Sequence, residues 1–367
     1  MMRVLIIGGY GNFGSTIARS LASETNLQLI IGGRSFEKAQ AFCALFEAAN
    51  PPEAIALDID AQLAPVLSRC APSLVIHTTG PFQTQDYRVA AACIAQGCHY
   101  VDLADARAFV SGIKGLDATA QARDVLVVSG ASSVPCLTAA LIDFYRPRFA
   151  RLTEATYGIS AAQQTNRGLA TTSAVLSYVG KPFLTRLNGE DRQVFGWQDL
   201  HAVCYPELGR RWFGNCDIPD LTLFPTRYPD LQTIRFSAGH EVPFLHFGLW
   251  AMSGLVRLRL LPTLAVFAPT LLKLAFCFDK LGSSCSGFHM NLKGISKNNQ
   301  PLEEQFFIVA RSGHGPMIPC MPAILITKAL AAGQRPERGA RPCLDLIDWP
   351  TYRDALRGLD ISVYPEE

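Results

Sequence analysis

Residues 3–21 read RVLIIGGYGNFGSTIARSL, an apolar run followed by a glycine-rich turn and the start of a helical pattern. Within it, Gly9, Gly11 and Gly14 have the spacing GxGxxG. In a strand–turn–helix unit the first glycine permits the tight turn, the second lets the backbone approach a pyrophosphate, and the third lets the helix pack closely on the strand. The amides and the dipole at the helix N-terminus attract phosphate. This stretch therefore predicts a dinucleotide-binding turn at the start of the chain.

The segment after the predicted second strand (residues 27–31) contains two glycines followed by Arg34 and Ser35. NAD-specific domains usually carry an acidic residue here, which binds the ribose 2′-hydroxyl. In this chain no carboxylate occurs between Glu24 and Glu37, whereas a guanidinium and a hydroxyl can bind a 2′-phosphate. We therefore expect NADP(H) rather than NAD(H). In the alternative interpretation Arg34 is only an exposed residue at a helix start, and the site accepts either nucleotide.

Short apolar runs alternate with helical patterns through the first 130 or so residues. Such alternation, with strands that are apolar throughout, is typical of a doubly wound parallel sheet covered by helices. The predicted helices are 15–21, 36–49, 61–70 and 86–95, and the predicted strands are 3–7, 27–31, 54–57, 73–78, 100–103 and 125–129. We predict an α/β fold that begins with a Rossmann domain at residues 1–147.

The sequence changes character beyond residue 147. An Asn188-Gly189 pair favours a tight hairpin turn, and further strands are indicated at 152–159, 233–238, 288–294 and 304–311. We expect residues 148–312 to form a second α+β domain of mixed sheet and helices. Residues 313–367 are expected to return and pack on the Rossmann domain.

Ligands of open parallel sheets bind beyond the carboxyl ends of the strands, so the residues that follow each strand are candidates for the site. In this chain they are Asp58, then Thr79 to Phe82, then Asp102 to Asp105, and then Gly130 to Pro135.

A family resemblance is carried jointly by residues 9–14, 32–35, 80–82, 99–103 and 130–135. The chain resembles the saccharopine dehydrogenase-like reductases, and residues 339–342 (GARP) are similar to the enoyl-reductase-like branch. The resemblance implies three groups of cofactor-binding residues. They are Gly9, Gly11, Asn12, Phe13 and Gly14 for the pyrophosphate, Arg34 and Ser35 for the 2′-phosphate with Asp58 near the adenine, and Thr79, Gly80, Pro81 and Phe82 near the nicotinamide ribose. It also implies that the second domain holds the substrate pocket and a homodimer contact.

A proton donor is often needed beside the cofactor in hydride-transfer chemistry. The candidates on or after a parallel strand are His99, Tyr100, Asp102 and Asp105, and a further candidate is His314, which lies between glycines. Structural alternatives remain open: the two aspartates can cap a helix, and either histidine can be a hydrogen-bonded structural residue. His77 lies inside a central strand, and we expect it to be buried and hydrogen-bonded.

Composition excludes several classes of protein. The chain has 33 Lys and Arg against 31 Asp and Glu, which provides no electrostatic footprint for nucleic acid. Its eleven cysteines form no Cys-x-x-Cys pair and indicate neither a zinc site nor a disulfide framework. No catalytic triad order, metal-ligand spacing or P-loop is present, so no metal is expected. With no signal-peptide layout, the expected location is the cytoplasm, and a membrane-peripheral one is also considered.

Residues 244–278 are rich in Leu, Phe and Trp and are interrupted by Arg257, Arg259, Lys273 and two prolines. A membrane span needs about 20 apolar residues, and the uncharged run at 260–272 is too short. Three interpretations remain: a buried helical pair at a dimer interface or pocket wall, a peripheral membrane contact, or an acyl-chain tunnel.

Two classes of function follow from the sequence. In the first, the protein is an NADP(H)-dependent oxidoreductase that reduces an imine, a carbonyl or an activated double bond in a small molecule. If the 244–278 stretch binds this substrate, the substrate is apolar or lipid-like. In the second, it is a non-catalytic NADP(H)-binding module that associates with a membrane surface or a protein partner. A closed, all-apolar wall beside the nicotinamide would favour the second class, because the fingerprint itself is common to both.

Overall fold

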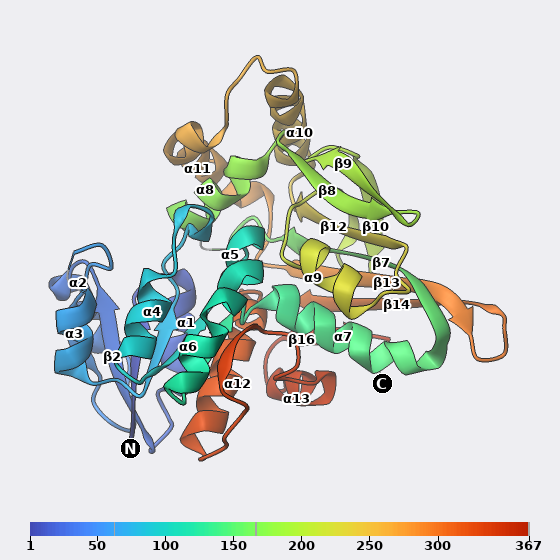
Figure 1. Ribbon diagram of the computed structural model, residues 1–367. Helices are drawn as coiled ribbons and strands as arrows, with labels where there is room; N and C mark the ends of the chain where they lie inside the picture. Colours follow the sequence, from blue (N-terminus) through green and yellow to red (C-terminus); the bar gives the residue numbers. More distant parts are fainter. Residues whose placement is uncertain (62, 166, 366–367) are drawn as a thin grey trace. The chain divides into compact units, whose positions relative to one another are not determined.

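The computed structural model describes residues 1–61, 63–165 and 167–365, and the chain divides into two compact units (Figure 1). The first comprises Met1–Ala140 and Pro316–Tyr352, and the second comprises Leu141–Gly315 and the chain from Arg353 onward. The segment expected at 313–367 is therefore shared between the two units.

The first unit contains a seven-stranded sheet in the order β15-β6-β5-β4-β1-β2-β3, with every neighbouring pair parallel. The strands are β1 (Met2–Ile7), β2 (Leu27–Gly33), β3 (Glu53–Ala56), β4 (Leu74–His77), β5 (His99–Asp102), β6 (Leu126–Ser129) and β15 (Gly339–Pro342). The strand order reverses between β1 and β4, which is where doubly wound sheets bind their ligands. The predicted parallel α/β sheet is confirmed, and β15 extends it beyond the strands that the sequence indicated.

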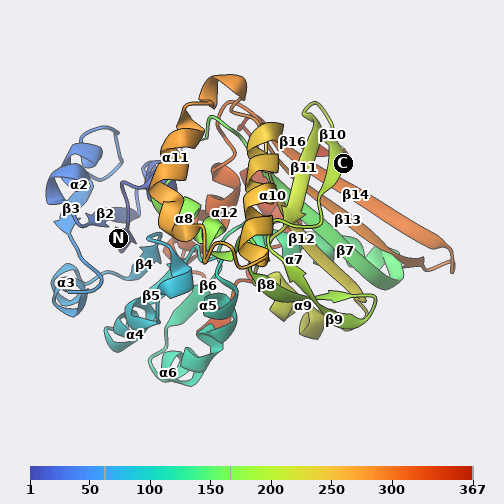
Figure 2. The same ribbon diagram turned by 90° about the horizontal axis from the view of Figure 1, so that it is seen from above.

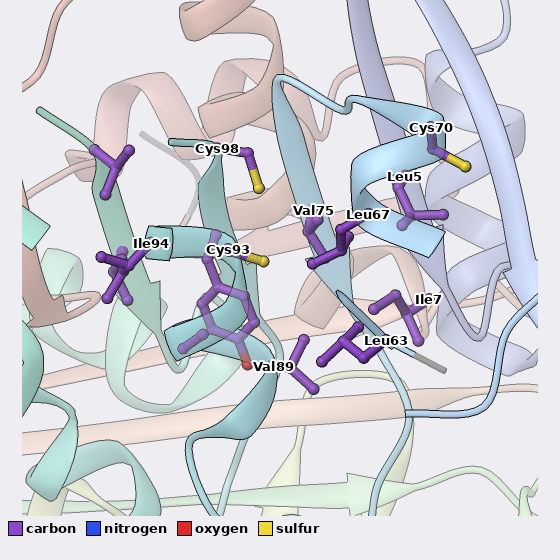
Figure 3. Packing of buried hydrophobic residues seen from close by; sticks show 14 of the residues in the cluster. Leu5, Ile7, Leu63, Leu67, Cys70, Val75, Val89, Cys93, Ile94 and Cys98 are labelled. Carbon is purple, nitrogen blue, oxygen red and sulfur yellow. The ribbon is translucent and has the colours of Figure 1, made fainter. Parts of the chain in front are cut away.

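Helices cover both faces of this sheet. The helices that lie wholly within this unit are α1 (Asn12–Leu21), α2 (Phe36–Cys43), α3 (Leu63–Cys70), α4 (Arg88–Ala95), α5 (Arg107–Gly112), α6 (Asp117–Ala122) and α12 (Met317–Ala331). Two further helices, α7 (Thr138–Tyr145) and α13 (Trp349–Ala355), run across the division between the units. Figure 3 shows Leu63 and Leu67 of α3 and Val89, Cys93 and Ile94 of α4 packed with Leu5 and Ile7 of β1 and Val75 of β4. Helix α1 contacts β1, β2 and α12 and contributes nothing to that cluster, so it covers the opposite face.

The helix predicted at 36–49 ends at Cys43, so its predicted length is wrong. Residues 44–50 form a turn and bends, in which the Ala49 amide N–H donates to the Ala22 carbonyl oxygen (2.7 Å) and the Asn50 side chain donates to the Leu27 carbonyl oxygen (2.8 Å), and these bonds direct the segment away from a helical path. Helix α1 starts three residues before the predicted start at residue 15, and the remaining predicted helices and strands of this unit lie within about two residues of the observed ones.

The second unit contains a seven-stranded mixed sheet in the order β10-β11-β12-β7-β13-β14-β16. The strands are β7 (Phe149–Ala161), β10 (His201–Tyr205), β11 (Gly209–Asn215), β12 (Thr233–His240), β13 (Ser286–Ser296), β14 (Pro301–Ala310) and β16 (Ile361–Tyr364). Only β12 and β7 pair in parallel. The prediction of a mixed sheet is confirmed, although β16 comes from the C-terminal segment that was assigned to the Rossmann domain.

A separate two-stranded hairpin, β8 (Pro182–Leu187) and β9 (Glu190–Phe195), turns at the Asn-Gly pair. Both turn residues have positive φ, +54° at Asn188 and +85° at Gly189, as the sequence predicted. The helices of this unit include α8 (Leu169–Tyr178), α9 (Asp220–Arg227), α10 (Pro243–Arg257) and α11 (Ala268–Phe276) (Figure 2). Within the described ranges 1–61, 63–165 and 167–365, no helix has the length and apolarity needed to cross a membrane.

A nearly buried carboxylate joins several segments of the second unit. The Glu241 Oε2 atom accepts the amide N–H groups of Gln163 (2.9 Å) and Ser283 (2.8 Å). Its Oε1 atom accepts the Ser283 hydroxyl (2.6 Å) and pairs with Arg211 (3.2 Å), whose side chain is 7% exposed. Burial works against ionisation, but these hydrogen bonds and the neighbouring guanidinium together hold the pKa of Glu241 below its ordinary value.

Candidate dinucleotide-binding site

The glycine turn after β1 lies against the end of β2. The amide N–H groups of Gly8 and Gly9 donate to the Gly32 carbonyl oxygen (2.8 and 3.1 Å), and Gly8 has a φ of +80°. A Cβ atom on Gly14 would lie only 2.2 Å from the Gly8 carbonyl oxygen, so the start of α1 can approach the turn only with glycine there. No side chain caps α1 at its N-cap residue Gly11. The turn and the first amides of α1 therefore fit the pyrophosphate of a dinucleotide.

The end of β2 carries the groups expected at a 2′-phosphate. Arg34 is exposed and forms no hydrogen bond or ion pair with any residue that the structure describes. The Ser35 hydroxyl caps α2, accepting the Lys38 amide N–H (3.2 Å) and donating to the Glu37 carboxylate (2.8 Å). Arg34 is thus an available cation, whereas Ser35 already has a structural role as a helix cap.

Tyr10 is a site residue that the sequence did not single out. A Cβ atom on Gly33 would lie 2.3 Å from its ring, and its hydroxyl accepts the Ser35 amide N–H (3.2 Å). The ring therefore fixes the path from β2 into α2. Its position between the fingerprint glycines was the signal that could have identified it.

The other two predicted groups follow β3 and β4. Asp58 is half-buried, and its Oδ1 atom accepts the Asp60 amide N–H (3.0 Å). Thr79, Gly80 and Pro81 are half-buried, and Phe82 is buried with its ring 5.0 Å from that of His77. These residues lie at the carboxyl edge of the sheet, as expected from the strand order.

A buried chain of polar side chains ends at Thr79. His77 has no exposed surface; its Nδ1 atom lies 3.0 Å from the Tyr100 hydroxyl, and its Nε2 atom lies 2.7 Å from the Thr79 hydroxyl. Burial lowers the pKa of His77 to about 3, so the ring is neutral at neutral pH. A neutral imidazole donates through one nitrogen and accepts through the other, so this ring fixes the orientation of both hydroxyls. The expectation that His77 is buried and hydrogen-bonded is confirmed.

Asp102 joins the ends of β5 and β6. Its Oδ1 atom accepts the amide N–H groups of Ala104 (2.9 Å) and Gly130 (2.8 Å) and the hydroxyl of Ser129 (3.0 Å). Burial raises the pKa of Asp102 to about 6 although these three hydrogen bonds favour the charged form. The carboxyl does not cap α5, whose N-cap is Ala106 without a side-chain cap, so the helix-cap alternative is wrong for this residue.

Asp105 and His99 lie at opposite ends of β5. Asp105 follows the carboxyl end, is half-buried, and accepts a hydrogen bond from Gln83 Nε2 (3.1 Å); desolvation raises the pKa of this carboxyl. His99 is the first residue of the strand and therefore lies at the opposite, amino edge of the sheet, where its Nδ1 atom accepts the Leu126 amide N–H (3.0 Å). The structure brings Asp102, Asp105 and Thr79 to one edge and leaves His99 at the other.

His314 belongs to the second unit. It is half-buried, and its Nδ1 atom accepts the Asp360 amide N–H (2.8 Å), which joins its loop to the segment before β16. Gln85, which no sequence signal indicated, donates from Nε2 to the Thr79 carbonyl oxygen (2.6 Å) and so fixes the loop after β4.

Comparison with known proteins supports this interpretation. Residues 4–128 match the family model described as the saccharopine dehydrogenase NADP binding domain. No curated protein matches the chain. Among solved structures, apo saccharopine dehydrogenase (L-Glu forming) from Saccharomyces cerevisiae shares the fold with a TM-score of 0.67, 12% identity and coverage of 99% of both chains. The amine dehydrogenase from Mycobacterium smegmatis shares it with a TM-score of 0.51, 12% identity and coverage of 94% of this chain and 95% of its own.

The family match also confirms the predicted cofactor class, because its description names NADP. Residues 4–128 therefore form a domain of the type described as the saccharopine dehydrogenase NADP binding domain.

Proposed function

We propose that this protein is an NADP(H)-dependent oxidoreductase that reduces an imine, a carbonyl or an activated carbon–carbon double bond. The observation that carries this proposal is the phosphate-binding turn together with the unpaired Arg34 at the end of β2. The two solved structures compared above are both named as dehydrogenases, which supports the reaction class. When bound, the cofactor supplies the hydride, and the reduced product gains one proton from the protein or from water.

The polar groups at the carboxyl edge of β4 and β5 favour catalysis over binding alone. A closed apolar wall would favour a non-catalytic NADP(H)-binding module, but here the half-buried Thr79 hydroxyl and Asp105 carboxyl lie at the strand ends. Groups of this kind can orient a substrate and exchange protons with it.

Among the predicted donors, Asp105 fits the role of proton donor best. Its carboxyl is only half-buried, one oxygen accepts a hydrogen bond from Gln83, and desolvation raises its pKa, which favours the protonated form that a donor needs. Asp102 is fully buried and its Oδ1 atom accepts three hydrogen bonds that join the ends of β5 and β6, so we assign it a positioning role. The neutral His77 cannot act as an acid, and we assign it the orientation of Thr79.

The cofactor part of the proposal is tested by calorimetric titration of the full chain with NADPH and NADH. We expect NADPH to bind more tightly, and we expect Arg34→Ala to weaken NADPH binding by roughly 10- to 100-fold, the value of charge-assisted hydrogen bonds to phosphate, with NADH unchanged. The matched control is Arg123→Ala, because Arg123 is also exposed but precedes the amino end of β6. Equal affinities for the two nucleotides, or equal effects of both variants, would contradict the assignment of Arg34.

The catalytic part is tested by following NADPH oxidation with a panel of imines, carbonyl compounds and short- and long-chain enoyl compounds. We expect turnover with one of these classes and a loss of at least about 100-fold in kcat for Asp105→Asn, with NADPH affinity retained. Tight NADPH binding without turnover of any class would reject the enzyme and support the non-catalytic binding module.

A further inference from the structure

The second unit exposes an unusual amount of apolar surface in one segment. Eleven of the sixteen exposed large apolar side chains in the described residues lie between Pro243 and Leu281, a stretch that we call the apolar segment. It contains α10, the connection 258–267, α11 and the residues up to Leu281 (gold to orange in Figure 2). The exposed side chains are Phe244, Phe247, Trp250, Leu255, Leu258, Leu260, Val266, Phe267, Leu274, Phe276 and Leu281. Soluble monomers rarely leave so many together without a binding role.

Helix α10 is apolar on both of its faces. Its inner face places Leu249 and Val256 in a small core shared with α8 and α11. Its outer face carries Phe244, Phe247 and Leu255, which are 36–47% exposed. A helix that is apolar all round is normally covered all round, but the described residues cover this outer face incompletely. The Phe244 ring contacts Phe278 (ring centroids 5.0 Å apart) and the Phe247 ring contacts Trp212 (5.3 Å), and both side chains remain exposed.

The greatest exposure occurs in the connection between the two helices. Leu258, Leu260 and Val266 are 70%, 68% and 66% exposed, and Arg257 and Arg259 lie beside them in the sequence. Apolar side chains at a tip flanked by arginines are typical of segments that insert shallowly among lipid headgroups.

The charge of the apolar segment favours one kind of partner. It has four exposed cations, Arg257, Arg259, Lys273 and Lys280, and its single acid, Asp279, is paired with Arg167. A symmetric dimer through this face would place the same cations of two copies against each other. An anionic lipid surface instead complements the positive charge and takes up the apolar side chains.

We propose that the apolar segment is a membrane-docking surface that binds the anionic headgroup layer of a bilayer, with the connection 258–267 inserted at the interface. The segment lies on the membrane and does not cross it. This placement would bring the protein to apolar substrates, but it does not depend on the proposed enzymatic activity.

The test is flotation of the full chain with vesicles of phosphatidylcholine alone and of phosphatidylcholine with phosphatidylserine. We expect the protein to float with the anionic vesicles. The double variant Leu258→Asp/Leu260→Asp should reduce the partition coefficient at least about tenfold, and Arg259→Gln/Lys273→Gln should reduce it roughly fivefold per cation. Matched controls outside the segment are Leu45→Asp, where the side chain is 68% exposed, and Lys297→Gln, and both should float as the unmodified protein does.

Trp250 supplies an independent readout, because it is the exposed tryptophan among the four. Its emission should shift to the blue on addition of anionic vesicles, and Trp250→Phe should abolish that shift. The proposal would be overturned if the monomeric protein did not float with anionic vesicles. It would also be overturned if light scattering showed a dimer that binds no vesicles and that Leu258→Asp/Leu260→Asp converts to monomer. A third contrary outcome is that Leu45→Asp reduces flotation as much as Leu258→Asp/Leu260→Asp does.

Discussion

The carboxyl of Asp102 is the charge most completely enclosed by the first unit. It has no exposed surface, one of its oxygens accepts three hydrogen bonds, and burial raises its pKa from 3.8 to about 6. Because the folded protein holds this proton more tightly than the unfolded chain does, the free energy of unfolding falls as the pH rises through this interval. This loss of stability is complete above about pH 6. It amounts to about 3 kcal/mol, because each unit of pKa shift corresponds to about 1.36 kcal/mol.

Asp102→Asn isolates this contribution, because an asparagine keeps a carbonyl oxygen for the same three donors and carries no charge. Its buried NH₂ group costs about 1–2 kcal/mol if it stays unpaired. We therefore expect the variant to be less stable than the unmodified protein near pH 4 and more stable near pH 8. Between these two pH values, the difference in free energy of unfolding between the two proteins should change by about 3 kcal/mol.

Thermal unfolding in buffers from about pH 4 to 8 measures this change. For a unit of this size, 1 kcal/mol corresponds to about 2–4 °C in Tm, so the difference should change by roughly 6–12 °C. Asp102→Ala is the control: it leaves the Ala104 and Gly130 amides and the Ser129 hydroxyl without their acceptor and should destabilise at every pH. If Asp102→Asn lowers Tm by the same amount at all pH values, the raised pKa of Asp102 is wrong.

Three further predictions concern the turn, the buried histidine and the second unit. Gly14→Ala should weaken NADPH binding more than about tenfold in calorimetry, because its Cβ would lie 2.2 Å from the Gly8 carbonyl oxygen. Tyr100→Phe leaves the His77 Nδ1 atom without its hydrogen-bond partner. We expect kcat to fall roughly tenfold, which corresponds to the net free energy of about one hydrogen bond, while nucleotide affinity stays unchanged. Glu241→Gln should destabilise the second unit by about 3–5 kcal/mol in urea unfolding, because it leaves a buried guanidinium without its counter-ion. Since the fold lowers the pKa of Glu241, the unmodified protein should lose this contribution as the pH falls, and the variant should not.

Each of these predictions has its own control. Gly115→Ala places a Cβ where no atom lies within 4 Å and should leave NADPH binding intact. A parallel loss of kcat and NADPH affinity in Tyr100→Phe would show that this hydroxyl only supports the fold. Unchanged unfolding of Glu241→Gln above pH 5 would contradict the role of the buried pair.

The sequence alone determined the dinucleotide-binding turn and the parallel order of the strands around it. Both depend on a few adjacent residues: the close approach at Gly14 leaves no room for a Cβ, and apolar strands that alternate with helices can pack only as a covered parallel sheet. The hairpin at Asn188 was equally local, since its positive φ is a property of the turn residues themselves.

Only the tertiary structure decided which distant segments meet. Two strands of the last 30 residues, β15 and β16, join different sheets, and short strands of this kind carry no pattern that selects a partner. The same is true of the buried chain from Tyr100 through His77 to Thr79, which depends on register between β4 and β5. For the apolar segment, the sequence left both burial and exposure open, because both faces of α10 are apolar. Burial depends on which surfaces pack together in three dimensions, and the described residues bury the inner face of α10 while they cover the outer face only in part.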